Sequence, residues 1–456
     1  MNESNDLEDL ASGVPGLGGV SLFVCGLCLL FALLPTTLAE SRLGSRVLFM
    51  GLVDNRLNPI RDWLSTEPGV SFAIVPSRLF KGSWEQTHGT EFQDEIRRFL
   101  RIYFPRSHED LAGYDVILFS SILVTMYTNV QVDMLLRAIR DGGACAIADT
   151  GGVMGKSQLM YGPWADSAVS EAFPCDSDKA AAYFGGAEAP NIGSFRVKLN
   201  RNASQPVFTP FLGFGIEKWR GHGGRIMFPK AGAEVWGWME FEELMSRETR
   251  PWVLSWKFGD ALTWSIADAP RYPFWSSYER GWSDNDYGKD MWLNMMYLGS
   301  GRELVTDVAL VHSTRATFTA YKRGVENLIS LMEFIGRFGA NTDSMMDDIE
   351  ALDESVDWSR EAYVMQRYAE SRELMEEVID ELGTISEKGV KLRREALYWV
   401  YAVEWLTVTG VSLVSGLVLY SLLVRRVLYA ETGTTRSRMG SESAAGKSRG
   451  ESDGTD

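Results

Sequence analysis

Twenty consecutive uncharged residues near the C-terminus, Trp405 to Val424, constrain this chain more than any other feature. At the helical rise of 1.5 Å per residue, about 20 apolar residues match the ~30 Å hydrocarbon core of a bilayer. Aromatic residues favour the membrane–water interface, and cytoplasmic flanks are enriched in arginine. Both signals are present, as an aromatic cluster from Tyr398 to Trp405 and as Arg425-Arg426. The sequence therefore predicts a transmembrane helix over 405–424 with a cytoplasmic tail over 425–456.

A second uncharged segment lies near the N-terminus, over residues 18–39. It ends in Thr37-Leu38-Ala39, a small-residue pattern typical of signal-peptide cleavage. The tail ahead of it, residues 1–17, holds four acids and no Lys or Arg, which is the wrong charge for a signal peptide. A cleaved signal peptide and a retained signal anchor both stay open. Either one exports the chain after it, so residues 40–404 are expected outside the cytoplasm.

Residues 44–312 show the pattern of a globular α/β domain. Apolar runs at 46–53, 70–75, 115–119 and 144–148 alternate with helical patterns at 57–66, 91–104 and 129–140. Continuous apolar strands between amphipathic helices predict a parallel sheet that is covered on both faces. From about residue 194 the pattern becomes alternating, with a turn pair at Gly259-Asp260. The predicted fold is a doubly wound, mainly parallel, flavodoxin-like sheet with antiparallel additions.

Residues 313–400 predict a helical stalk. Apolar residues at 325–335 and at 364–385 recur with a spacing of three or four, like a short coiled-coil seam. Between 343 and 381, fourteen acids face three arginines, a net charge of −11. Like charges along neighbouring helices repel, so the two apolar stripes are expected to pack within one chain as an antiparallel hairpin. The Ser/Gly/Thr-rich tail predicts disorder.

Two stretches, GYDVILFSS (113–121) and DGGACAIADTGG (141–152), flank a predicted helix. This arrangement resembles the class I glutamine amidotransferase-like fold, in particular its ThuA-like branches, over residues 46–152. The final ALYW…EWL…TG…RR pattern is similar to archaeal membrane-anchored envelope proteins with such a domain. The resemblance implies an amidotransferase-like domain over 44–312.

The catalytic residues of that family are absent. The family's glutaminases carry a cysteine nucleophile in G-x-C-x-G, where this sequence has Asp149 within residues 147–151. None of the histidines (His88, His108, His222 and His312) has the family's Glu two residues on. Cys145 lies four residues earlier, inside a predicted buried strand. A carboxylate does not replace the thiolate as nucleophile, so no glutaminase activity is expected.

Polar residues follow the predicted parallel strands where each strand ends: Asp54, Asn55, Ser120, Ser121, Asp149 and Thr150. Ligands of doubly wound folds bind at this edge, and these oxygens suit a polar ligand or a hard cation. The alternative interpretation is that they only cap the adjoining helices. The loop TGGVMGKS (150–157) is one residue short of phosphate-loop spacing. We therefore predict no cofactor and assign no metal site.

Three further features bear on an exported domain. Asn202 begins a glycosylation sequon, Asn202-Ala203-Ser204. Cys145 and Cys175 can pair in an oxidising compartment, although burial of Cys145 argues against a disulfide. Nine tryptophans lie between residues 219 and 292, and they fit either a glycan-binding surface or, as we favour, a core.

These observations lead to two hypotheses about the function of the protein. The net charge of −16 disfavours nucleic acid as a partner. The leading hypothesis is a non-catalytic extracytoplasmic domain, anchored in the bilayer, that binds a ligand, an envelope protein or a glycan, or acts as an envelope scaffold. The alternative is a hydrolase or glycan-modifying enzyme that uses Asp149 with a second carboxylate such as Asp54. The sequence does not decide the oligomeric state.

Overall fold

In the computed structural model, the described residues are 44–53, 58–78, 93–120, 122, 124–149, 167–176, 178–179, 195–216, 219–221, 226–241, 249–268, 270 and 285–445. Met1–Leu43 and Gly44–Asp456 form separate units, and the described residues belong to the second. The first membrane-directed segment, 18–39, lies outside the described residues.

The described strands form one mixed sheet with the order β2-β1-β3-β4-β9-β8-β7-β5-β6. The four pairs β2-β1, β1-β3, β3-β4 and β4-β9 are parallel. The other four pairs are antiparallel. The α/β class and the antiparallel additions are confirmed, but the sheet is half antiparallel rather than mainly parallel. The strand bounds are β1 Ser45–Leu52, β2 Val70–Arg78, β3 Val116–Ser120, β4 Cys145–Ala148, β5 Phe195–Leu199, β6 Arg220–Gly221, β7 Glu234–Phe241, β8 Arg250–Phe258 and β9 Ala261–Ile266.

Helices cover both faces of the parallel half. Alternate residues of β1, such as Val47 and Phe49, share one core with α2 (Ile60–Ser65) and α7 (Gly288–Gly299). Their neighbours, such as Leu48 and Met50, share the other core with three helices. These are α3 (Gln93–Tyr103), α4 (His108–Ala112) and α5 (Asn129–Arg140). Burial on both faces is the reason that these strands are apolar without interruption.

Local signals fix α5 at the bounds that the sequence predicts. The Thr128 hydroxyl accepts a hydrogen bond from the backbone N–H of Gln131, and the Gln131 side chain accepts one from the N–H of Thr128. This reciprocal capping box satisfies two backbone donors that would otherwise lack partners. After the helix, Gly143 takes a positive φ of 71°, a conformation that glycine adopts without strain.

The antiparallel half is packed with tryptophan. Its hairpin turns at Gly259-Asp260, as predicted, where Gly259 has a φ of 60°. Trp219 and Trp252 stack edge to face with ring centroids 5.3 Å apart, and Trp236 lies at the same distance from Trp264. These four side chains and Trp292 are buried. The core interpretation is confirmed for these five. Trp238 and Trp256 are only partly buried, and Trp275 and Trp282 lie outside the described residues.

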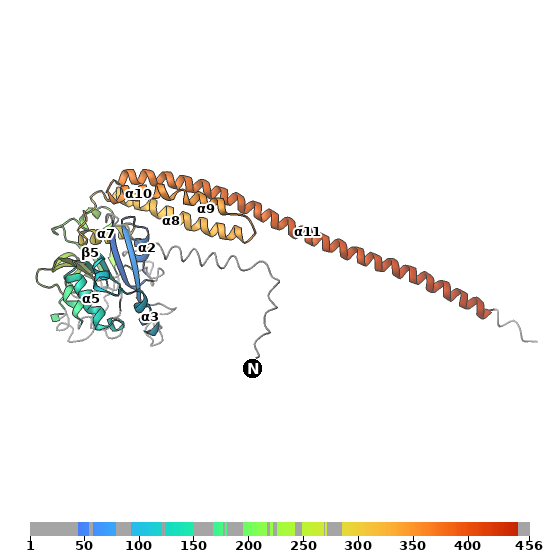
Figure 1. The fold of residues 1–456 in the computed structure, drawn as a ribbon, viewed down its shortest axis with the longest axis horizontal. Coiled ribbons are helices and arrows are strands. Elements are labelled where there is room, and N and C mark those ends of the chain that lie inside the picture. Colours follow the sequence, from blue (N-terminus) through green and yellow to red (C-terminus); the bar gives the residue numbers. More distant parts are fainter. Residues whose placement is uncertain are drawn as a thin grey trace, which may run out of the picture. The chain divides into compact units, whose positions relative to one another are not determined.

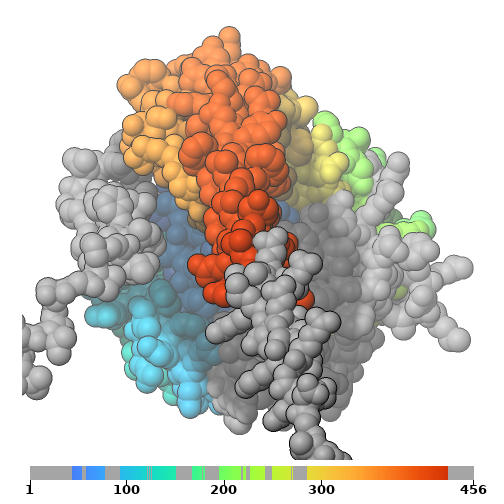
Figure 2. All heavy atoms as spheres, turned by 90° about the vertical axis from the view of Figure 1, so that its right-hand side faces the viewer, coloured from blue at the N-terminus to red at the C-terminus, as the bar shows by residue number. Residues whose placement is uncertain are grey.

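A helical bundle comes next in the chain, made of α8 (Val308–Gly336), α9 (Asp343–Glu350), α10 (Asp353–Val364) and the start of α11 (Tyr368–Ala445). Buried seam residues of α11, including Met375, Val378, Leu382 and Ile385, pack against α8, α9 and α10 of the same chain. Intramolecular packing was expected, and it is observed (Figure 2).

The predicted antiparallel hairpin is wrong, because α8 and α11 are parallel. The Thr314 hydroxyl donates to the carbonyl of Tyr368, and a Cβ added to Gly389 would lie 2.9 Å from Leu331 Cδ2. Residue numbers therefore rise together along the two helices. The short helices α9 and α10 carry the chain back between them, a return that residue spacing alone does not reveal.

The second part of α11 extends beyond the bundle (Figure 1). Its last buried residue is Ala396, and side chains such as Trp405 and Leu413 are more than half exposed. By length and composition this helix can cross a membrane, and its apolar window is not covered by other described residues. The helix continues to Ala445, whereas disorder was predicted from residue 425. No proline interrupts residues 425–445.

Candidate functional site

Three polar side chains meet at the carboxyl ends of β1, β3 and β4. The Ser120 hydroxyl donates to the Asp149 carboxylate. Asn58 Nδ2 donates to Ser120 Oγ at 2.8 Å and to the carbonyl of Leu52 at 3.0 Å. We call Asn58, Ser120 and Asp149 the strand-edge cluster. It lies where β1 is flanked by β2 on one side and β3 on the other, the switch point at which open α/β sheets bind ligands.

The strand-edge cluster is closed to solvent. Asn58 and Asp149 are 1% exposed and Ser120 is 2% exposed. Asn58 Oδ1 also accepts from the N–H of Ile60, so this side chain also holds the turn that leads into α2. The sequence predicted Ser120 and Asp149 at this edge but missed Asn58, although an Asn just before Pro59 and a helix is a known start signal.

The other predicted edge residues, Asp54, Asn55, Ser121 and Thr150, lie outside the described residues, as does the loop 150–157. The carboxylate pair of Asp54 and Asp149 is therefore not described. A role of these residues in binding a ligand stays a prediction.

Cys145 and Cys175 are both buried, free thiols in the structure, and they do not form the candidate disulfide. Burial raises the pKa of Cys175 to about 12, and it raises the pKa of Cys145 further. Cys145 packs so closely on α7 that a Cβ added to Gly299 would lie 2.1 Å from its sulfur. Both thiols are therefore inert core groups at neutral pH. Asn202 lies exposed, and its glycosylation stays a prediction.

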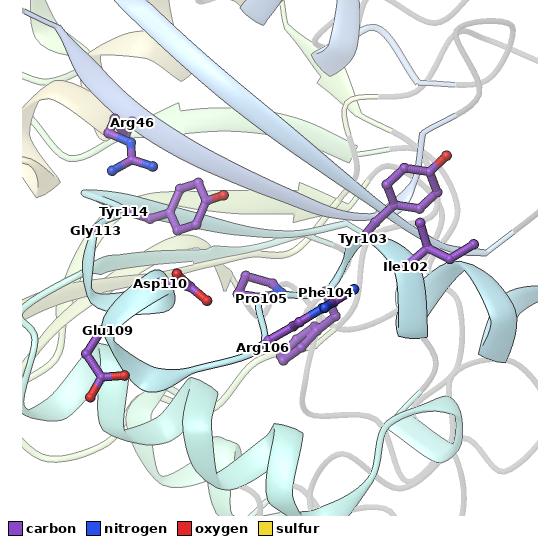
Figure 3. Close-up of a pocket in the computed structure, with 10 residues that line it drawn as sticks. All are labelled: Arg46, Ile102, Tyr103, Phe104, Pro105, Arg106, Glu109, Asp110, Gly113 and Tyr114. Carbon is purple, nitrogen blue, oxygen red and sulfur yellow. The ribbon is translucent and has the colours of Figure 1, made fainter. Parts of the chain in front are cut away.

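A pocket of about 420 Å³ lies at the opposite, amino-terminal edge of the parallel strands (Figure 3). The Arg46 guanidinium stands over the Tyr114 ring, 5.1 Å from its centroid, at one side. Half-exposed Ile102 and Tyr103 stand at the other side. Asp110, between them, accepts from the N–H of Ser107 and is thereby part of a capping box. No pattern in the sequence pointed to this pocket.

A large buried polar cluster joins the α/β part to the helical bundle. We call it the ionic junction. It comprises one carboxylate next to β2, three side chains of α7, one arginine of α8 and one tyrosine of α10: Glu67, Lys289, Asp290, Tyr297, Arg315 and Tyr363.

Arg315 is the centre of the ionic junction. Its Nε donates to Glu67 Oε2 at 3.0 Å and to Tyr363 Oη at 2.8 Å. Its Nη1 donates to Asp290 Oδ1 at 2.6 Å. The Tyr297 hydroxyl donates to the second oxygen of Glu67, also at 2.6 Å. The guanidinium on α8 therefore links the segment before β2 with α7 and α10.

The remaining contacts complete the charge balance. His312 Nδ1 lies 2.8 Å from Asp290 Oδ2, and Lys289 Nζ lies 3.8 Å from Glu67 Oε2. Lys289 also donates to the carbonyl and the hydroxyl of Thr66, at 3.1 and 3.0 Å. Two carboxylates therefore face two cations inside the protein. A buried charge is tolerated when it is paired and hydrogen-bonded in this way.

The pKa values of the ionic junction result from burial and from its charges. Burial would raise the pKa of Glu67, but Arg315 and Lys289 together hold it below the ordinary value. Burial would likewise raise the pKa of Asp290, and hydrogen bonds from His312 and Arg315 outweigh it. Burial lowers the pKa of Lys289 to about 8, although Glu67 opposes the change. At neutral pH both carboxylates are therefore ionised.

No motif in the sequence identified the ionic junction. Glu67 stands in a Thr-Glu-Pro-Gly stretch that has the composition of a surface turn. One signal was present: Arg315 shares a helix face with Val311 and Phe318, which are buried in the bundle core. A charge on an apolar helix face indicates a buried partner.

Comparisons with known proteins give little guidance. No protein-family model matches the chain, and no curated protein sequence matches it. Among solved structures, the cytoplasmic protein STM3548 from Salmonella typhimurium is 14% identical, with a TM-score of 0.38 over 55% of this chain and 98% of its own. The cytoplasmic protein STM1381 from Salmonella typhimurium LT2 is 13% identical, with a TM-score of 0.38 over 56% and 99%. Likeness at this level carries no conclusion about this chain.

Proposed function

We propose that this chain is a membrane-anchored scaffold or partner-binding protein whose α/β unit is non-catalytic and lies outside the cytoplasm. The main support for the proposal is that α11 is one continuous helix with two different parts. Its first part is buried in the bundle, and the same unbroken helix then presents the bare apolar segment 405–424. Such a helix fixes a folded unit to a bilayer without a flexible linker.

The ionic junction supports a holding role for the bundle. Arg315 of α8 is buried against Glu67 and Asp290 of the α/β part, and the Lys322 ammonium of α8 donates to Ser65 at 2.6 Å. Groups from both sides are paired, so separating sheet from bundle would leave charges unpaired in an apolar site. We therefore expect the α/β part and the bundle to move as one piece.

The strand-edge cluster supports a non-catalytic core. The order β2-β1-β3-β4 with helices on both faces is compatible with a doubly wound, amidotransferase-like core. Asp149 replaces the family's nucleophile, and its carboxylate is closed off by Ser120 rather than open to a substrate. A hydrolase would need this carboxylate to reach a reacting atom within hydrogen-bonding distance.

Membrane fractionation tests the anchor. The full chain should stay with membranes after alkaline carbonate extraction, and a variant that lacks residues 405–424 should be released. Release of the full chain would contradict the proposal. The matched control deletes residues 425–445, which leaves the apolar segment intact and should leave the chain in the membrane.

Cysteine labelling tests the side of the membrane. A cysteine placed at Ser441 should react with an impermeant maleimide only after lysis, and one at Asn202 should react in intact cells. Labelling of position 441 from outside would overturn the proposed orientation. It would not contradict the proposed anchoring of the chain by α11.

A further inference from the structure

We propose that the exposed side of α10 is a docking surface for a basic, amphipathic segment of another protein. This inference rests on the proposed partner-binding role and names the chemistry of that partner. We call Glu354, Trp358, Glu361 and Met365 the α10 face. Steps of four, three and four residues separate them, so they lie one above another on one side of the helix and its C-cap, over about 16 Å.

The α10 face is open, whereas the opposite side of the helix is closed. Trp358 is 54% exposed and Met365 is 47% exposed, and the two glutamates are exposed as well. Val356 and Tyr363, on the other side of α10, are buried in the bundle core. Tryptophan is highly buried on average, and aromatic residues and methionine are enriched where proteins meet. An exposed tryptophan beside an exposed methionine therefore indicates an anchor for a partner.

Charge on this part of the bundle selects a basic partner. Residues 343–381 include fourteen acids and three arginines. Each of these arginines already pairs with an acid, and one further acid pairs with Lys388. Glu354 and Glu361 form no ion pair with any described residue. The α10 face therefore alternates free carboxylates with apolar side chains, which suits a segment that carries lysine or arginine beside apolar residues, and such cations also stack on a tryptophan ring.

The position of the α10 face along the bundle excludes lipid headgroups as its occupant. Ser359 Oγ donates to the carbonyl of Ser371 at 2.8 Å, so Trp358 lies near the level of Ser371 on α11. From Ser371, α11 continues for 34 residues, about 51 Å, to Trp405 at the start of the apolar segment. The headgroup layer is only about 5–8 Å deep on each side of the hydrocarbon core. The α10 face is therefore expected in the aqueous space.

Two other occupants fit the α10 face less well. A second copy of this chain would bring the same carboxylates against it, and like charges repel. A divalent cation would use the carboxylates but not Trp358 or Met365, and the described part of the chain gathers no three acidic, histidine or cysteine side chains that could hold a metal ion. A basic protein segment is the occupant that uses all four side chains.

Peptide binding to the full chain tests this surface. The chain is reconstituted in phosphatidylcholine nanodiscs, and empty nanodiscs provide the blank. Fluorescence anisotropy compares two dye-labelled probes of equal charge: a helical peptide of lysine and leucine with an apolar face, and an oligolysine. The natural chain should bind the amphipathic peptide about tenfold or more tightly than the oligolysine, because only the amphipathic peptide offers apolar side chains to Trp358 and Met365.

The variants separate the apolar anchor from the charges. Trp358→Ala should weaken binding of the amphipathic peptide by about tenfold and leave the oligolysine unchanged. Glu354→Gln with Glu361→Gln should weaken both probes. The matched control is Glu377→Gln with Glu381→Gln, which removes the same charge from exposed positions of α11 and should change the affinity for the amphipathic peptide by roughly twofold or less.

Equal affinity of the natural chain for the two probes would overturn the α10 face as a docking surface. A Trp358→Ala variant that binds both probes like the natural chain would overturn it as well. Neither result would bear on carbonate extraction or cysteine labelling, which test the anchor and the orientation. Release of the full chain by carbonate, with the difference between the probes intact, would instead overturn the anchor and not this surface.

Discussion

The strand-edge cluster and the ionic junction are both buried and polar, but they are built differently. In the strand-edge cluster, one carboxylate is satisfied by a hydroxyl that is itself hydrogen-bonded to an amide. In the ionic junction, one arginine meets two carboxylates and a tyrosine from distant parts of the chain. The first organises the ends of neighbouring strands, whereas the second joins two layers of the structure. Removal of one group should therefore cost much less in the first than in the second.

Substitution of Arg315 should give the largest effect. Arg315→Ala leaves Glu67 and Asp290 buried without the cation that they share. Glu67 then keeps Lys289 and the Tyr297 hydroxyl, and Asp290 keeps His312. Breaking a buried ion pair from one side typically costs about 3–5 kcal/mol. Denaturant unfolding of the full chain in detergent measures this loss. The control is Arg372→Ala, an exposed pair with Glu376, which should change the free energy of unfolding by about 0.5 kcal/mol or less. Equal effects of the two variants would refute the distinction.

The pH dependence of stability should come next in size. Burial lowers the pKa of Lys289 from 10.5 to about 8 in the folded protein. Between these values the unfolded chain binds more protons, so the contribution of Lys289 to stability rises as pH rises from 8 to 10.5. The change is on the order of 1–3 kcal/mol. Unfolding of the natural chain and of Lys289→Met across this range isolates the contribution, and parallel curves would contradict the assignment.

Substitution of Asp149 should have the smallest effect. Asp149→Asn keeps an oxygen that can accept from Ser120, so the free energy of unfolding should change by about 1 kcal/mol or less. Partner binding should also be kept. A measured turnover of any glycoside or amide substrate that disappears in this variant would favour the enzyme hypothesis instead. The comparison variant is Asn58→Ala, which removes the amide that joins the loop after β1 to Ser120.

One part of the candidate site, the pair of Ser120 and Asp149, could be anticipated because a general rule places it. The carboxyl ends of parallel strands lie at one edge of a sheet, so Ser120 and Asp149 were predicted to be near each other, and they are hydrogen-bonded. Asn58 was missed because its role depends on a contact with Ser120, 62 residues away. The ionic junction was missed for the same reason, since 248 residues separate Glu67 from Arg315.

The sequence by itself determined the features that depend on the spacing of nearby residues. The capping box and glycines set the bounds of α5, apolar runs set the buried strands, and an uncharged run of 20 residues set the apolar segment of α11. Tertiary structure alone decided that β9 pairs in parallel with β4, with Ala146 opposite Thr263, and that α8 and α11 run in the same direction. It also decided that Arg315 is buried against two carboxylates. Periodicity shows which face of an element is apolar, but not which distant element covers that face.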